Sequence, residues 1–211
     1  MNILIISPHG DDEVLGCGGT IKKHTLNGDD VYLCIVTVPT LPKWDSKYIA
    51  NRKNEISSSS KILGIKAHME LGYNTTELDN YSASDIIDNL VKVKNDTHPD
   101  IVYIPFYGDL HQDHRTLFNM CMIAFKDINK IISYETLSET ELGINSFKPN
   151  LYVDIKSTMK YKLEAMKCYK SELKEYPHCR SIKGIENLAM KRGNEVGLEY
   201  AESFILIRET L

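Results

Sequence analysis

The chain has 211 residues, of which 42% are hydrophobic and 26% are charged. This composition is typical of a globular protein and excludes a disordered or collagen-like chain. At about 150 residues per domain, the length allows one large domain and argues against two full ones. The 25 Lys and Arg residues against 29 Asp and Glu residues give a net charge of −4. This balance offers no general attraction to nucleic acid or to an anionic membrane surface, so binding must come from a local site.

The apolar stretches are short. The longest ones, such as Val31 to Val38, fall well below the roughly 20 residues that a membrane-spanning helix needs. No basic region precedes the amino-terminal apolar run, which therefore indicates a first strand rather than a secretory signal. The five cysteines are an odd number without a C-x-x-C pair, which favours a reducing compartment. The sequence thus predicts a cytoplasmic protein with no membrane span.

Strand-like and helix-like patterns alternate along the first 130 residues. Aliphatic and β-branched runs predict strands at residues 2–7, 31–38, 67–71 and 101–105. Apolar residues at helical spacing predict helices that start near residue 12, cover residues 46–63 with Gly64 as the cap, run from about residue 86 to residue 97, and pass through residues 117–125. This alternation is typical of a parallel sheet with helices on both sides.

The pattern is weaker beyond residue 130. Strands are predicted at 131–134, 152–155 and 204–208, and one helix contains Met159, Leu163 and Met166. The predicted fold class is α/β. We expect a single Rossmann-like domain over residues 1–211, with a mostly parallel sheet flanked by helices on both faces.

Titratable residues gather in two loops that follow predicted strands. The first is Pro-His-Gly-Asp-Asp-Glu at residues 8–13, and the second is Asp-Leu-His-Gln-Asp-His at residues 109–114. In open parallel sheets, ligands bind beyond the carboxyl ends of the strands. The two loops supply three histidines and four aspartates at such ends, which is more than packing requires.

A divalent metal ion would explain this density, because crowded carboxylates repel one another unless a cation compensates them. Imidazole and carboxylate groups suit zinc, which in catalytic sites takes three protein ligands and leaves a fourth position for water. That water has a pKa of about 7 and becomes a nucleophile at neutral pH. One His and one Asp from the first loop with one His from the second would meet the ligand count.

Each motif alone has a simpler interpretation. Asp11 and Asp12 could merely cap the following helix, and a lone His111 or His114 would be structural. The joint pattern at matching strand ends favours the metal site.

Three further features carry less information. The glycine cluster at residues 16–19 superficially resembles a dinucleotide-binding loop, but it lies inside a helical pattern and indicates close packing. Arg52 lies near the apolar stripe of the 46–63 helix, where it could bind a substrate oxygen or extend toward solvent. Surface or turn positions are predicted for His24, His68, His98 and His178.

The two loops resemble those of the PIG-L or LmbE-like family of zinc-dependent de-N-acetylases. Residues 8–13 are similar to its Pro-His-x-Asp-Asp-Glu motif, and residues 111–114 to its His-x-Asp-His motif. Weaker similarities cover nearly the whole chain and lie at Arg52, Glu55, Leu63-Gly64, Tyr152-Val153-Asp154, Arg192-Gly193 and residues 200–204.

The resemblance implies a role for each motif residue. It implies that His9, Asp12 and His114 bind one zinc ion and that Asp11 is the general base. The resemblance further implies that His111 would stabilise the oxyanion or protonate the leaving amine, that Asp113 would orient His111, and that Arg52 would contact the substrate.

This sequence departs from the family pattern at two positions. Gly10 replaces the proline that is common between His and Asp, and Asp109 stands where some members have a tyrosine that assists the oxyanion. The sequence therefore does not identify a residue that assists His111 in stabilising the oxyanion.

The implied function is removal of the N-acetyl group from an amino sugar, nucleotide sugar or glycosyl conjugate, with release of acetate and a free amine. The expected partner is a small N-acetylated sugar, no nucleic acid is expected, and a homo-oligomer is compatible with this interpretation. Two alternatives stay open. One is a metallohydrolase of another amide or of a phosphoester, which metal stoichiometry would distinguish. The other is a noncatalytic nucleotide-sugar-binding module, which tight nucleotide binding without metal would favour.

Overall fold

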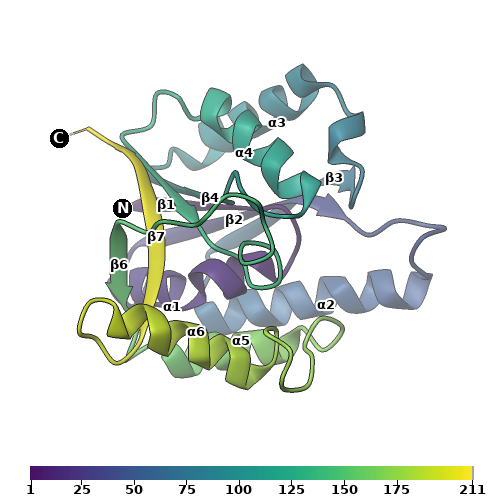
Figure 1. Ribbon diagram of the computed structural model, residues 1–211. Helices are drawn as coiled ribbons and strands as arrows, with labels where there is room; N and C mark the ends of the chain where they lie inside the picture. Colours follow the sequence, from purple (N-terminus) through teal and green to yellow (C-terminus); the bar gives the residue numbers. More distant parts are fainter. Residues whose placement is uncertain (211) are drawn as a thin grey trace.

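The computed structural model describes residues 1–210, and a sheet of seven strands runs through them (Figure 1). The strands are β1 (Asn2–Ser7), β2 (Asp30–Val38), β3 (Ala67–Asn74), β4 (Ile101–Ile104), β5 (Lys130–Tyr134), β6 (Leu151–Asp154) and β7 (Ala201–Glu209). The helices are α1 (Asp12–Leu26), α2 (Ser46–Leu63), the 3-10 turn η1 (Leu78–Asn80), α3 (Ala83–Thr97), α4 (Gln112–Ala124), α5 (Met159–Cys168) and α6 (Ile182–Asn194).

The sheet is mostly parallel. Its strand order is β3-β2-β1-β4-β5-β7-β6. The first five of these strands are parallel to one another, and β7 pairs antiparallel with both β5 and β6. The predicted α/β fold with a mostly parallel sheet is confirmed.

Helices cover both faces of the sheet. In Figure 1, α3 and α4 lie above the sheet, and α1, α2, α5 and α6 lie below it. Strand β1 shows why both faces are covered: Ile3 and Ile5 pack into one apolar cluster, whereas Leu4 and Ile6 pack into the other. Successive side chains of a strand point to opposite faces, so a continuous aliphatic run is buried only between two layers of helices.

Local sequence signals fix the ends of α2. The Asp45 side chain accepts a hydrogen bond of 2.7 Å from the Tyr48 amide, which satisfies one of the free N–H groups of the first turn. At the other end, Gly64 has φ = 81°, a left-handed conformation that glycine adopts without steric cost. The predicted cap is confirmed.

The glycine cluster in α1 permits close packing, as the sequence predicted. A Cβ atom on Gly19 would lie 2.7 Å from the Ile155 side chain, and one on Gly16 would overlap the ring of Tyr134. The helix can therefore lie directly on its neighbours only because these positions have no side chain.

Several local predictions were incomplete. Strand β3 continues to Asn74 rather than ending at Leu71, and neither η1 nor α6 was predicted. Helix α6 is stabilised by its Ser181 cap, whose hydroxyl accepts a hydrogen bond from Gly184, and by burial of Ile185. The sequence did not indicate this helix, because its glycines and polar residues interrupt the apolar spacing that is typical of a helix.

The prediction for His24 was wrong. Its ring is half-buried at the end of α1, within 2.7 Å of Asp29 Oδ2 and 3.1 Å of the Tyr103 hydroxyl. Sequence spacing could not show this, because Tyr103 comes from a distant strand.

The pairing of β1 with β4 positions the two motif loops. These strands run parallel side by side, with Ile3 opposite Ile101 and Ile5 opposite Tyr103. Their carboxyl ends therefore lie at the same edge of the sheet, and the loops that follow them meet there. Within residues 1–210, no helix combines the length and the apolar character needed to cross a membrane.

Candidate functional site

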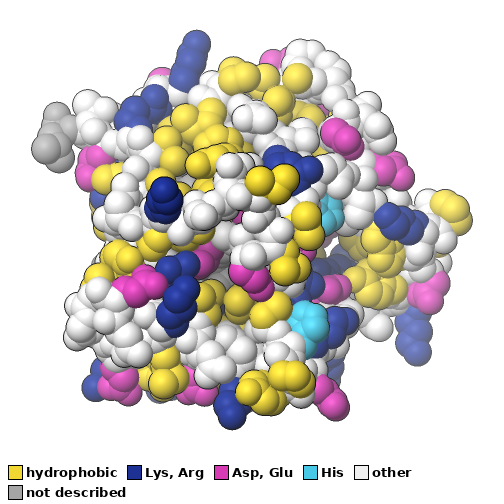
Figure 2. All heavy atoms as spheres, viewed as in Figure 1, with side chains coloured by type: hydrophobic (Ala, Val, Ile, Leu, Met, Phe, Trp, Pro, Cys, Tyr) yellow, Lys and Arg dark blue, Asp and Glu magenta, His cyan; other side chains and the backbone are white. Residues whose placement is uncertain are grey.

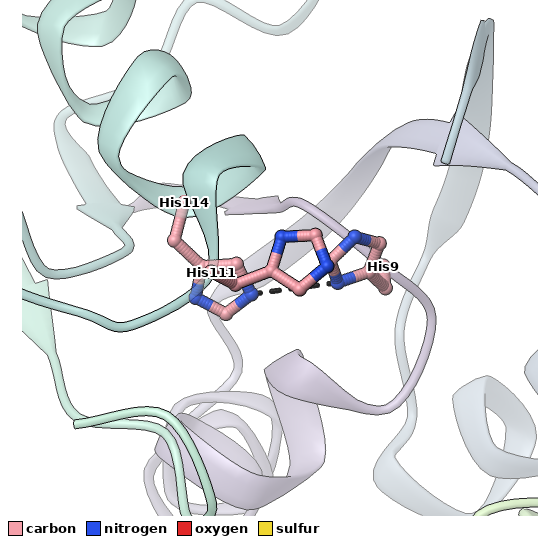
Figure 3. Close-up of side chains that lie close together, drawn as sticks. All are labelled: His9, His111 and His114. Carbon is pink, nitrogen blue, oxygen red and sulfur yellow. Dashed lines mark hydrogen bonds between the residues drawn. The ribbon is translucent and has the colours of Figure 1, made fainter. Parts of the chain in front are cut away.

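Three histidines converge where the two loops meet. His9 lies in the loop between β1 and α1, His111 caps the start of α4, and His114 lies in its first turn. Figure 3 shows the three rings close together, with a dashed line joining His9 to His114. One nitrogen from each ring lies within 4.8 Å of the other two, so the group could hold a metal ion.

Asp12 gives this site a tighter donor set. Nδ1 of His9 lies 3.1 Å and Nε2 of His114 lies 3.2 Å from the same atom, Oδ2 of Asp12, and the two nitrogens are 3.4 Å apart. In a tetrahedral zinc site, bonds of about 2.0 to 2.2 Å separate neighbouring ligand atoms by roughly 3.3 Å. The three atoms therefore have the spacing of three corners of such a site.

The other ring nitrogen of both His9 and His114 lies close to a carboxylate. Nε2 of His9 lies 3.0 Å from Oδ2 of Asp113, and Nδ1 of His114 lies 2.8 Å from Oδ2 of Asp109. A carboxylate on one ring nitrogen fixes the proton there and leaves the other nitrogen to bind a metal ion. Asp109 is only 1% exposed. It thus orients His114, a role that its place in the sequence did not indicate.

Asp12 is fully buried and carries negative charge. Burial raises its pKa, but the charge on His114 and hydrogen bonds from His114 and His9 outweigh burial and hold the pKa well below the ordinary value. Oδ1 of Asp12 has no hydrogen-bond partner among residues 1–210. An ionised carboxylate with an unsatisfied oxygen fits a cation site.

Asp11 has a strained backbone beside this group. Its φ of 124° is in a region that non-glycine residues rarely occupy, and its carboxyl group is buried. The Asp11 amide donates a 2.8 Å hydrogen bond to Glu13, which also accepts one of 2.5 Å from the Tyr169 hydroxyl. Burial raises the pKa of Glu13 to about 7. Glu13 therefore stabilises the Asp11 backbone, a role that sequence reasoning missed.

Two arginines reach the Asp11 carboxylate. Arg52 lies 3.1 Å from Oδ1, and Arg180 lies 3.4 Å from Oδ2. Burial raises the pKa of Asp11 to about 6, although both arginines lower it. Arg52 is 6% exposed and also pairs with Glu55, so its guanidinium points into the site rather than toward solvent. The side chain therefore does not extend toward solvent, and its contact with a substrate oxygen stays a prediction.

The hydrogen bond at Nδ1 defines the tautomer of His111. The backbone amide of Asp113 donates to this nitrogen over 3.1 Å, so the nitrogen must carry its lone pair. Burial together with the charges of His9 and His114 lowers the pKa of His111 to about 4. The neutral ring consequently carries its proton on Nε2, where it can act as a hydrogen-bond donor.

Asp113 contacts His9 more closely than His111. Its Oδ2 is 3.9 Å from Nδ1 of His111, against 3.0 Å from His9. The backbone amides of Thr76 and Leu78 also donate to this carboxylate, over 2.7 and 3.1 Å. The expected orientation of His111 by Asp113 is therefore provided by the backbone amide, while the carboxylate orients His9.

A pocket of about 500 Å³ opens onto this site. The space-filling view shows a hollow right of centre, with basic, acidic and histidine side chains around the opening (Figure 2). The motif residues His9, Asp11, His111 and His114 line it together with Arg52. Sequence reasoning missed several lining residues, among them Trp44, Glu139 and Arg180, because they lie outside both motifs and carry no local signal.

Comparisons with known proteins agree with the geometry. Residues 4–125 match the family described as PIG-L, GlcNAc-PI de-N-acetylase. The chain is 30% identical to the diacetylchitobiose deacetylase of Thermococcus kodakarensis, over 95% of this chain and 80% of that protein. It is 33% identical to the uncharacterized deacetylase YaiS of Escherichia coli, over 80% and 90%. The solved N,N'-diacetylchitobiose deacetylase of Pyrococcus horikoshii superposes with a TM-score of 0.80 at 26% identity, covering 97% of this chain and 83% of that one.

Proposed function

The chain belongs to the GlcNAc-PI de-N-acetylase (PIG-L) family, and on this premise we propose that it is a zinc-dependent N-deacetylase. The substrate is an amino sugar, nucleotide sugar or glycosyl conjugate whose acetamide is hydrolysed to acetate and a free amine. The observation that carries the proposal is the triangle of donor atoms from His9, Asp12 and His114 beside the buried Asp11 carboxylate.

These three residues would hold the zinc ion. His9 would bind through Nδ1, Asp12 through Oδ2 and His114 through Nε2, because the other ring nitrogens face Asp113 and Asp109. When bound, zinc supplies a Lewis acid and makes water nucleophilic at neutral pH. His111 is not assigned as a ligand, because its Nδ1 accepts a backbone hydrogen bond and its Nε2 carries a proton.

Asp11 and His111 supply the proton transfer and the hydrogen bond that amide hydrolysis needs. With a pKa of about 6, Asp11 is mostly ionised at neutral pH and accepts a proton from the attacking water. Nε2–H of His111 donates to the carbonyl oxygen as it gains negative charge. The proton collected by Asp11 passes to the departing nitrogen, so the amine leaves in a neutral or protonated form.

Arg52 would help to position the substrate. Arg52 lines the pocket and pairs with Asp11, so it can hold the base in position and contact a substrate oxygen.

We assign the whole chain, residues 1–211, to one deacetylase domain, because a single sheet joins its described elements. All five cysteines are free, which supports a reducing, cytoplasmic location.

The decisive experiment is a substrate screen. Zinc-loaded protein is incubated with N-acetyl sugars, nucleotide sugars and glycosyl conjugates, and release of free amine is measured. We expect turnover of at least one N-acetyl sugar, abolished by a chelator and strongly reduced in Asp11→Asn. Absence of amine release from every N-acetylated sugar by zinc-loaded protein would contradict the proposed function.

A further inference from the structure

Glu139 lies on the loop between β5 and β6, beyond the carboxyl end of a parallel strand. The backbone of this loop is strained, because the preceding Ser138 has φ = 73° without being glycine. The Leu110 amide donates a 3.0 Å hydrogen bond to the Glu139 carbonyl oxygen, which ties this loop to the second motif loop. Glu139 is thus held beside the proposed catalytic residues by backbone contacts rather than by its own side chain.

The Glu139 carboxyl group is available to a ligand. It is half-buried and lines the pocket, yet it has no hydrogen-bond or ion-pair partner among the residues that the structure describes. Burial raises the pKa of Glu139, as do the charges of Asp12 and Asp109, and together they outweigh the charges of His114 and Arg180, which lower it.

The buried cations of the same pocket, in contrast, already have acidic partners. Arg52 pairs with Asp11 and Glu55, and Arg180 pairs with Glu172 at 3.1 Å as well as with Asp11. The remaining basic lining residue, Lys53, is exposed to solvent. Near the reaction centre the pocket wall thus offers a hydrogen-bond acceptor with negative charge, and no buried cation without an acidic partner.

We propose that Glu139 is a specificity-determining residue, which binds hydroxyl groups of a neutral N-acetylated saccharide and disfavours substrates with a phosphate close to the acetamide-bearing ring. An ionised carboxylate only accepts hydrogen bonds, so it matches the hydroxyl donors of a sugar. It repels a phosphate group, and the charges of both arginines in the same wall are already paired with carboxylates. This inference rests on the proposed deacetylase function and selects neutral saccharides over nucleotide sugars within it.

The test compares two substrates in wild type and three variants, one of which is a control. N,N'-diacetylchitobiose represents the neutral class and UDP-N-acetylglucosamine the anionic class, and kcat and KM are measured for wild type, Glu139→Gln and Glu139→Lys. The control is Glu175→Gln, which removes the same charge from an exposed residue outside the pocket. Thermal unfolding and zinc content, measured on each variant, separate binding effects from folding or metal loss.

We expect wild type to favour the neutral substrate. Glu139→Gln should raise its KM about tenfold with little change in kcat, because a hydrogen bond to a charged group is lost in binding. Glu139→Lys should shift the ratio of kcat/KM values toward the anionic substrate by at least about tenfold. Glu175→Gln should behave as wild type.

Two results would overturn the inference while leaving a deacetylase in place. One is a Glu139→Gln variant with the same KM as Glu175→Gln, and the other is a wild type that processes UDP-N-acetylglucosamine as well as the neutral disaccharide. If no sugar is deacetylated, calorimetry of N,N'-diacetylchitobiose binding tests the role of Glu139 independently of turnover. Weaker binding by Glu139→Gln than by wild type then supports the role of Glu139, and equal or absent binding refutes it.

Discussion

The Asp113 carboxylate lies 3.0 Å from Nε2 of His9, on the opposite side of the imidazole from the nitrogen that faces Asp12. This contact fixes the ring so that Nδ1 is directed at the proposed zinc site. A carboxylate in this position also makes the ring a stronger ligand, because it stabilises positive charge on the imidazole. Asp113 is therefore tied to metal binding through His9.

The first prediction concerns Asp113→Asn. Loss of the negative charge next to His9 should weaken zinc binding by about 10- to 100-fold, a range typical of the groups that orient metal ligands. Competition with a chromogenic chelator measures this affinity. Unchanged affinity with a lower kcat would instead return Asp113 to the role implied by the family resemblance, an action on His111 alone.

The second prediction separates the two histidines at the start of α4. His114→Ala removes one of three proposed ligands, so the protein should lose zinc and activity together. His111→Ala should keep zinc but lose about 10²- to 10³-fold in kcat, because its Nε2–H is needed in the transition state. Elemental analysis beside steady-state kinetics gives both readouts. The reverse outcome, zinc lost in His111→Ala but kept in His114→Ala, would reverse the ligand assignment, and loss of zinc in both variants would favour the group of His9, His111 and His114 as the metal site.

The third prediction concerns Asp11→Asn. The substitution preserves shape but cannot accept a proton, so kcat should fall by about a hundredfold or more with zinc content unchanged. KM should change little, provided that Arg52 keeps its other partner, Glu55. Near-normal turnover would show that another carboxylate is the base.

The fourth prediction is a release of protons on zinc binding. Burial lowers the pKa of His114, but Asp12 and Asp109 outweigh it and raise the pKa to about 10. At pH 8 the metal-free ring therefore holds both protons, and binding through Nε2 must displace one. Because protons compete with the metal for this nitrogen, zinc affinity should fall as the pH falls.

Calorimetry in two buffers of different ionisation enthalpy measures this release. We expect about one proton or more per zinc ion at pH 8. A buffer-independent heat at that pH would mean that no proton leaves, and His114 would then not be a ligand that starts protonated.

The fifth prediction concerns a buried ion pair that supports α1. Lys162 lies 2.6 Å from Glu202 and donates to the Leu15 carbonyl oxygen, while Glu202 accepts from the amides of Gly19 and Thr20. Lys162→Met leaves a buried carboxylate without its cation, so the free energy of unfolding should fall by about 3 to 5 kcal/mol. Urea unfolding measures this change.

The control for that substitution is Lys156→Met. Lys156 forms an ion pair of the same length, 2.6 Å, with Glu199, but both side chains are more than half exposed. Its loss should change the free energy of unfolding by less than about 1 kcal/mol. Equal effects of the two substitutions would show that burial of the Lys162 pair contributes nothing.

The amino-acid pattern alone predicts the strands of the parallel half of the sheet and the position of both motif loops. Continuous aliphatic runs such as Ile3 to Ile6 are stable only when both faces of the strand are buried. The pattern therefore predicts that β1 lies between two layers of helices. Parallel strands then bring their carboxyl ends to one edge, and this predicts that His9 lies near His114.

Only the tertiary structure decided which groups outside the motifs join the site. Arg180 and Glu139 come from irregular loops after α5 and β5, where no periodic pattern of the sequence sets their positions. Asp113 contacts His9 rather than His111 because of differences in distance near the 3 Å scale of a hydrogen bond. The periodicity of a helix or strand does not specify such distances. Periodicity reports which face of an element is buried, whereas hydrogen-bond partners depend on the packing of elements that are far apart in the chain.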